Sequence, residues 1–142
     1  MTPYVYEICT RIHGHVAVLG LAVLLHPIIS MHKQKRLRKG TRWSLWLSVF
    51  FVLGAYMMGL WIYPDYRTTV KPRLISHNIA IAYLFESKEH LAFCSVLAVC
   101  LGGFLALKTN RERDLKLARI LLFWGWFCGV IVAVLGIIVA AA

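Results

Sequence analysis

The chain has 142 residues, of which 60% are hydrophobic and 15% are charged, and its mean hydropathy is +0.70. Soluble domains are about 45–50% apolar and about 25% charged, so this composition excludes a soluble globular domain, a disordered chain and a disulfide scaffold. Sixteen Lys and Arg residues against six Asp and Glu give a formal net charge of +10. Because the basic residues gather between apolar stretches, we expect them to meet lipid headgroups rather than nucleic acid.

Four apolar stretches divide the chain, and their lengths predict four membrane-spanning helices. A helix needs about 20 apolar residues to cross a bilayer. We therefore expect an all-α fold, an integral membrane four-helix bundle that forms a single domain over residues 1–142. A bundle this small leaves most of its surface to the lipid bilayer, to other membrane subunits or to further copies in a homo-oligomer. The predicted spans are residues 12–31, 43–63 (ended by Pro64), 88–107 and 120–142.

The third apolar stretch is too long for one span and contains charged residues. Residues 79–107 would form a helix of about 43 Å, whereas the hydrocarbon core of a bilayer is about 30 Å thick. Glu86, Lys88 and Glu89 lie within this stretch, and each charge at mid-membrane costs on the order of 3 kcal/mol. We therefore predict that the span begins near Lys88 and that residues 73–85 form a helix along the membrane surface. The alternative is a long tilted helix that brings the charges inside, paired with other groups.

The charges of the connecting segments predict the orientation. Residues 32–42 carry six Lys or Arg and residues 108–119 carry five, whereas the segment between the second and third spans carries three. Short loops that are rich in Lys and Arg stay in the cytoplasm. We therefore expect these two loops to be cytoplasmic and both termini to face outward, in an inner membrane of the bacterial type.

The histidines are the main candidates for chemistry. A histidine inside a membrane span is costly, and its presence there indicates a function. The first and third spans run parallel because the second lies between them, and both regions carry two histidines thirteen residues apart. Five of the six histidines fall on the first span or on the approach to the third: His13, His15, His26, His77 and His90.

Parallel spans with paired histidines resemble the arrangement of the membrane b-type cytochromes. In that family, a four-helix bundle holds two hemes through paired imidazoles, one near each membrane face. The resemblance implies one heme b, with a second heme as the alternative, and an electron-transfer subunit rather than a stand-alone catalyst. Electrons would pass between a donor at the outer face and quinone or a partner protein. The implied axial ligands are His13 or His15 with His90 at the outer face, and His26 with His77 or another partner for a second heme.

Helical geometry gives mixed support to a second heme. Thirteen residues leave two side chains about 140° apart around a helix, whereas the eleven between His15 and His26 leave them about 20° apart. Because His77 lies before the predicted third span and is not a simple stacked ligand, a single heme at the outer face, between the first and third spans, is the simpler interpretation. Arg11 and Arg73 would lie near that face, where a guanidinium matches a heme propionate in bidentate fashion.

A second arrangement competes for His90. Glu86, Glu89 and His90 have helical spacings of three and four residues, so they can share one face of a helix. Three residues of the first span would complete a cluster of carboxylates and imidazoles: Glu7, His13 and His15. Such a cluster suits a non-heme metal such as iron, manganese, copper or zinc, a proton relay or a quinol-oxidation site. The remaining alternative is a heme-free structural or assembly subunit of a larger membrane complex.

Overall fold

The computed structural model describes residues 1–32, 36–109 and 111–141, without the side chains of residues 3, 77 and 141. Within these ranges the chain is helical almost throughout, as predicted. Four helices are long and apolar enough to span a membrane: α1 (Pro3–His32), α2 (Lys39–Asp65), α4 (Ile79–Lys108) and α5 (Glu112–Ala141). A π-helical turn, η1 (Tyr66–Val70), and the short helix α3 (Lys71–His77) connect α2 to α4.

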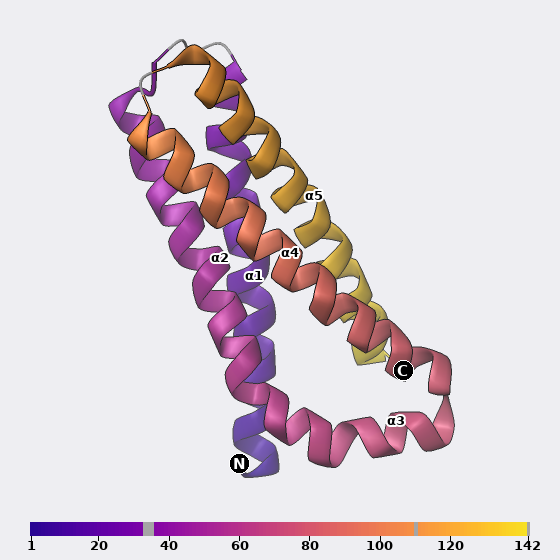
Figure 1. The fold of residues 1–142 in the computed structure, drawn as a ribbon. Helices are drawn as coiled ribbons and strands as arrows, with labels where there is room; N and C mark the ends of the chain where they lie inside the picture. The colour runs from indigo at the N-terminus through magenta and orange to yellow at the C-terminus, as the bar shows by residue number, and fades with distance from the viewer. Residues whose placement is uncertain (33–35, 110, 142) are drawn as a thin grey trace.

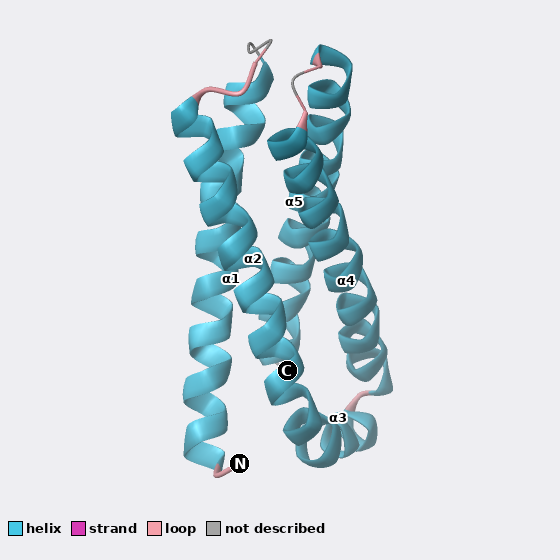
Figure 2. Cartoon of the chain, turned by 60° about the vertical axis from the view of Figure 1, so that its left-hand side comes forward, coloured by secondary structure: helices cyan, strands magenta, loops and turns pink. Residues whose placement is uncertain are grey.

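The long helices form two antiparallel hairpins, α1–α2 and α4–α5 (Figure 1). The hairpins also contact each other, α1 against α5 and α2 against α4, so α1 and α4 occupy opposite corners of the bundle. We call the end that holds the α1–α2 and α4–α5 connections the loop end. The opposite end, with α3 and both termini, is the α3 end. In the view of Figure 1 the hairpins diverge toward the α3 end, and α3 runs across that end between them (Figures 1 and 2).

Close backbone contact holds α4 against α5. A Cβ atom on Gly125 would lie 2.7 Å from Val99 Cγ2 and 3.0 Å from the carbonyl oxygen of Ser95. The Ser95 hydroxyl donates a 2.7 Å hydrogen bond to the Gly125 carbonyl oxygen. Gly102 repeats the pattern, since its Cβ would lie 3.0 Å from the Ala118 carbonyl oxygen. Small residues at such positions let two membrane helices approach closely.

The buried core is narrow, and most apolar side chains face outward. In the most apolar 18-residue stretch of each long helix, only 17–28% of the residues are buried inside the bundle. A surface this apolar is expected where lipid or neighbouring subunits surround a bundle. The core cluster lies mainly toward the loop end and contains Leu24, Met31, Leu45, Val52, Val99, Ala106, Leu115, Ala118 and Leu122.

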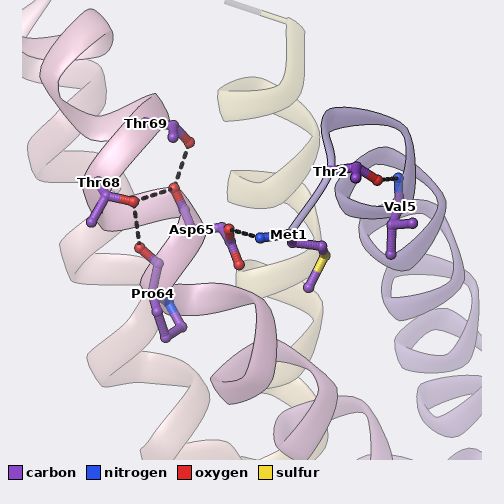
Figure 3. A network of polar contacts seen from close by, with 7 residues as sticks. All are labelled: Met1, Thr2, Val5, Pro64, Asp65, Thr68 and Thr69. Carbon is purple, nitrogen blue, oxygen red and sulfur yellow. Dashed lines mark hydrogen bonds and ion pairs between the residues drawn. The ribbon is translucent and has the colours of Figure 1, made fainter.

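The end of α2 differs from the prediction that Pro64 stops the second helix. α2 continues through Pro64 to Asp65 and passes directly into η1. Proline lacks an N–H group, and a π-helical turn is one way in which a chain absorbs the lost hydrogen bond. Within this turn the Thr68 hydroxyl lies 3.0 Å from the Pro64 oxygen and 3.3 Å from the Asp65 oxygen, so it bonds to carbonyls at the start of the π-helical turn. The Asp65 carboxylate also pairs with the Met1 ammonium group at 3.0 Å (Figure 3).

The surface helix predicted over residues 73–85 also differs from the structure. α3 ends at His77, and residues 79–85 belong to α4, which begins at Ile79 rather than near Lys88. Asn78 causes the break: its backbone is extended, and its side chain caps α4 by accepting a 3.1 Å hydrogen bond from the Ala80 N–H. The charged turn therefore lies inside one continuous helix of 30 residues, and the point at which this helix enters the membrane stays a prediction.

The glycine contact between α4 and α5 predicts a difference between two Gly→Ala variants. Gly125→Ala should lower the free energy of unfolding by roughly 1–3 kcal/mol, because the new methyl group overpacks against α4. Gly54→Ala is the control: no atom lies within 4 Å of its new Cβ, and Ala favours a helix over Gly by up to about 1 kcal/mol. Unfolding in detergent micelles measures both, and an equal response of the two variants would contradict this packing.

Candidate functional site

The side chain of His13 extends from α1 to the backbone of α2. Its Nδ1 is 2.8 Å from the carbonyl oxygen of Ala55, and a Cβ on Gly59 would lie 3.2 Å from His13 Cε1. Because a carbonyl oxygen only accepts hydrogen bonds, Nδ1 is assigned the ring proton and Nε2 carries the lone pair. The α2 backbone thus fixes the orientation of the His13 ring.

His15 and His90 are exposed and are bound to their own helices. His15 Nδ1 donates to the Arg11 carbonyl oxygen at 2.7 Å, and His90 Nδ1 donates to the Glu86 carbonyl oxygen at 2.8 Å. At about 100° per residue, the His15 and His13 side chains point about 160° apart around α1. The structure therefore places the rings of His13 and His15 on different sides of α1.

His90 points away from the core of the bundle. It precedes the fully buried Val99 by nine residues, which places the two side chains about 180° apart on α4. Since α1 and α4 occupy opposite corners of the bundle, the structure does not bring His90 together with His13 or His15.

The remaining predicted ligands are also separated from one another. His26 is exposed, and its Nε2 lies 3.4 Å from the Ser30 hydroxyl. The His77 side chain, its predicted partner, lies outside the described part of the structure. Glu7 pairs with Arg11 at 2.6 Å, with both side chains exposed, and Arg73 is exposed on α3. Among the described side chains, no three His, Cys, Asp or Glu residues gather as ligands of a metal ion.

A different set of polar side chains lies at the α3 end and is related by charge. The Lys88 charge acts on the His13 ring and the charges of Glu86 and Glu89 act on the Tyr66 phenol, while no hydrogen bond joins these side chains in the described part of the structure. These groups come from α1, η1 and α4, so they link both hairpins. We call this set the Tyr66 cluster: His13, Tyr66, Glu86, Lys88 and Glu89.

Lys88 turns its charge into the bundle. It precedes Val99 by eleven residues, so the two side chains lie on nearly the same face of α4. The Lys88 ammonium lies 4.2 Å from the centre of the Phe85 ring, at a distance suited to a cation–π interaction. Its aliphatic stem passes α5, where a Cβ on Gly136 would lie 4.0 Å from Lys88 Cδ. The stem thus lies beside α5 while the ammonium meets the Phe85 ring, an arrangement typical of a long cationic side chain.

Glu86 pairs with Lys71, the first residue of α3. Both side chains are partly buried, and the pair joins α3 to α4. An ion pair of this kind lowers the cost of carrying a carboxylate in an otherwise apolar helix. Lys71 is thus the partner that the Glu86 carboxylate needs within a single long helix.

Tyr66 is the most buried member of the cluster, with 4% of its surface exposed. Its ring stacks on Phe85 with ring centres 3.5 Å apart and an angle of 12° between the planes. In the described part of the structure its hydroxyl has no hydrogen-bond partner. Leaving a buried hydroxyl unsatisfied costs about 1–3 kcal/mol, so a ligand that bonds to this oxygen recovers that free energy.

The sequence analysis did not select Tyr66 or Lys88 as site residues. The charge of Lys88 within an apolar stretch was a usable signal, because ionisable residues in membrane helices usually have a function. Tyr66 had no such signal: its burial depends on η1, which redirects the chain after α2.

Comparisons with known proteins add no family assignment. No family model, no curated protein and no solved structure matches this chain. The interpretation of the site therefore depends on its own geometry.

The unpartnered hydroxyl predicts that Tyr66→Phe stabilises the ligand-free protein. Removing it should raise the free energy of unfolding by about 1 kcal/mol, because a buried polar group without a partner is lost and the ring stacking is kept. Tyr83→Phe is the matched control, since Tyr83 is 61% exposed and its loss of a hydroxyl should change little. Unfolding in detergent tests both variants, and a destabilised Tyr66→Phe would show that the hydroxyl has a partner.

Proposed function

We propose that this chain is an electron-transfer subunit of a membrane complex and that the Tyr66 cluster binds the head of a quinol and accepts its protons. The observation that carries the proposal is the buried, unpartnered Tyr66 hydroxyl. A phenol both donates and accepts hydrogen bonds, so it suits the hydroxyl of a quinol and the carbonyl of a quinone. The ring system and tail of a quinol are apolar, as are the surrounding helices.

The cluster also holds groups that accept protons. Oxidation of a quinol to a quinone releases two electrons and two protons. Glu86 is held in its ion pair with Lys71, which leaves Glu89 and the Nε2 lone pair of His13 as acceptors within the cluster. The electrons pass to a redox centre in a partner subunit. Lys88 adds a positive charge that favours electron-rich forms of the head group.

Quinone binding to the purified protein tests this proposal. A short-tailed quinone quenches tryptophan fluorescence, and titration in detergent gives its Kd. Tyr66→Phe should weaken binding about 3- to 10-fold, the effect of losing one hydrogen bond of about 0.5–1.5 kcal/mol. Tyr83→Phe should bind as the unmodified protein does.

Equal affinity in the two variants would remove Tyr66 from the binding site. Failure of the unmodified protein to bind quinone at all would overturn the proposed function, whatever the stability of the Tyr66→Phe variant.

Heme binding is the second candidate, favoured by the hydrogen bonds of His15 and His90. In both residues Nδ1 donates to a backbone carbonyl, which leaves Nε2 oriented for a metal, the arrangement that supports ligation by histidine. Both rings face outward, so a heme would lie between this chain and a neighbouring helix of another subunit or copy. The chemistry that it would supply is one-electron transfer.

A reduced-minus-oxidised visible spectrum of the purified protein tests the heme hypothesis. A b-type α-band that disappears in His90→Ala and persists in His32→Ala, a variant of the loop-end histidine, would support it. A preparation that stays colourless after reconstitution with heme would refute it.

A further inference from the structure

The loop end contains a groove that the proposed function does not use. It has a volume of about 840 Å³ and lies where the end of α1, the residue before α2 and the first half of α5 meet. We call the apolar part of its lining the walls and the polar part the rim. The apolar lining consists of Ile28, Ile29, Ile120, Phe123 and Trp124, and the polar lining of Ser30, His32, Arg38 and Arg119.

The rim is cationic. Arg119 Nη1 donates to His32 Nδ1 at 2.6 Å, which connects α5 to α1 beside the groove. With Nδ1 as the acceptor, His32 Nε2 carries the ring proton and is a further donor. Arg38, just before α2, adds a second guanidinium. Guanidinium groups bind phosphate oxygens through two parallel hydrogen bonds, so the rim is suited to a phosphate group.

The surroundings strengthen the positive potential at this end. Within the part of the chain that the structure describes, nine of the fourteen Lys and Arg residues, but only two of the six carboxylates, lie in residues 36–42 and 108–119. Both carboxylates already have partners: Glu112 pairs with Lys116 at 3.1 Å, and Asp114 accepts a 2.7 Å hydrogen bond from Thr109. The charges at the loop end are thus complementary to an anion.

The apolar walls indicate what kind of anion fits. Ile29 is 68% exposed, Trp124 is 55% exposed and Ile120 is 49% exposed, so the groove opens onto the apolar side of the bundle rather than into a closed core. A soluble phosphate compound would leave these side chains uncovered. A phospholipid covers them with an acyl chain while its phosphate reaches the rim.

We propose that this groove binds one anionic phospholipid, with its phosphate at Arg38, Arg119 and His32 and an acyl chain along Ile120, Phe123 and Trp124. Small-ligand pockets are roughly 300–1,000 Å³, so the groove has room for a head group and the upper part of a chain. The site lies at the opposite end of the bundle from the Tyr66 cluster and does not depend on the proposed function.

Native mass spectrometry of the detergent-purified protein tests the proposal. Phosphatidylglycerol and phosphatidylcholine with the same acyl chains are titrated separately, and the retained lipid is counted. We expect the anionic lipid to be retained at one copy per chain and at lower concentration than the zwitterionic lipid. Arg119→Gln should weaken this retention about tenfold, as expected for the loss of one charge-assisted contact, whereas the exposed Arg113→Gln should leave it unchanged.

A second readout locates the acyl chain. Phosphatidylglycerol with brominated chains should quench the fluorescence of the unmodified protein, and Trp124→Phe should remove part of that quenching. The proposal is overturned if the unmodified protein retains both lipids equally, if Arg113→Gln weakens retention as much as Arg119→Gln, or if inorganic phosphate displaces the lipid. The comparison of lipids on the unmodified protein does not depend on how well the variants fold.

Discussion

The α3 end is organised around the charged turn inside α4. The helix runs without interruption from Ile79 to Lys108 and carries Glu86, Lys88 and Glu89 within a largely apolar sequence. Charges in such a helix are costly unless they are paired. The ion pair of Lys71 with Glu86 therefore joins α3 to α4 across the end of the bundle, and the inward turn of Lys88 places its ammonium over the Phe85 ring.

The two ends of the bundle differ in charge and hence in the chemistry that they offer. At the α3 end, both carboxylates and cations lie near a buried phenol, which suits a small molecule that exchanges protons. At the loop end, cations predominate beside an apolar groove, which suits the head group of an anionic lipid. Between them, the close contact of Gly125 with Val99 holds α4 against α5.

Hydropathy was sufficient to predict four long helices, because length and apolar content follow directly from the thickness of a bilayer. The start of α4 was not predictable from the cost of charge alone, since that cost depends on the Lys71 partner and the Asn78 cap, which only the folded chain brings into place. The histidine pattern identified His13 as a candidate, but spacing does not state which face of a helix is buried. The sequence therefore did not predict that His15 and His90 point away from the core. Tyr66 was not selected because its burial depends on η1, which redirects the chain after α2.

Cross-linking tests whether the Lys88 charge lies on the same side of the bundle interior as the His13 ring, whose electrostatics it affects. In a chain whose four native cysteines are replaced by Ala, His13→Cys with Lys88→Cys is treated with a short bifunctional maleimide and compared with His15→Cys with Lys88→Cys. The structure predicts an intramolecular cross-link in the first pair and little in the second, because residues 13 and 15 lie about 160° apart on α1. Equal cross-linking of both pairs, or preferential cross-linking of residues 15 and 88, would contradict the structure of the Tyr66 cluster.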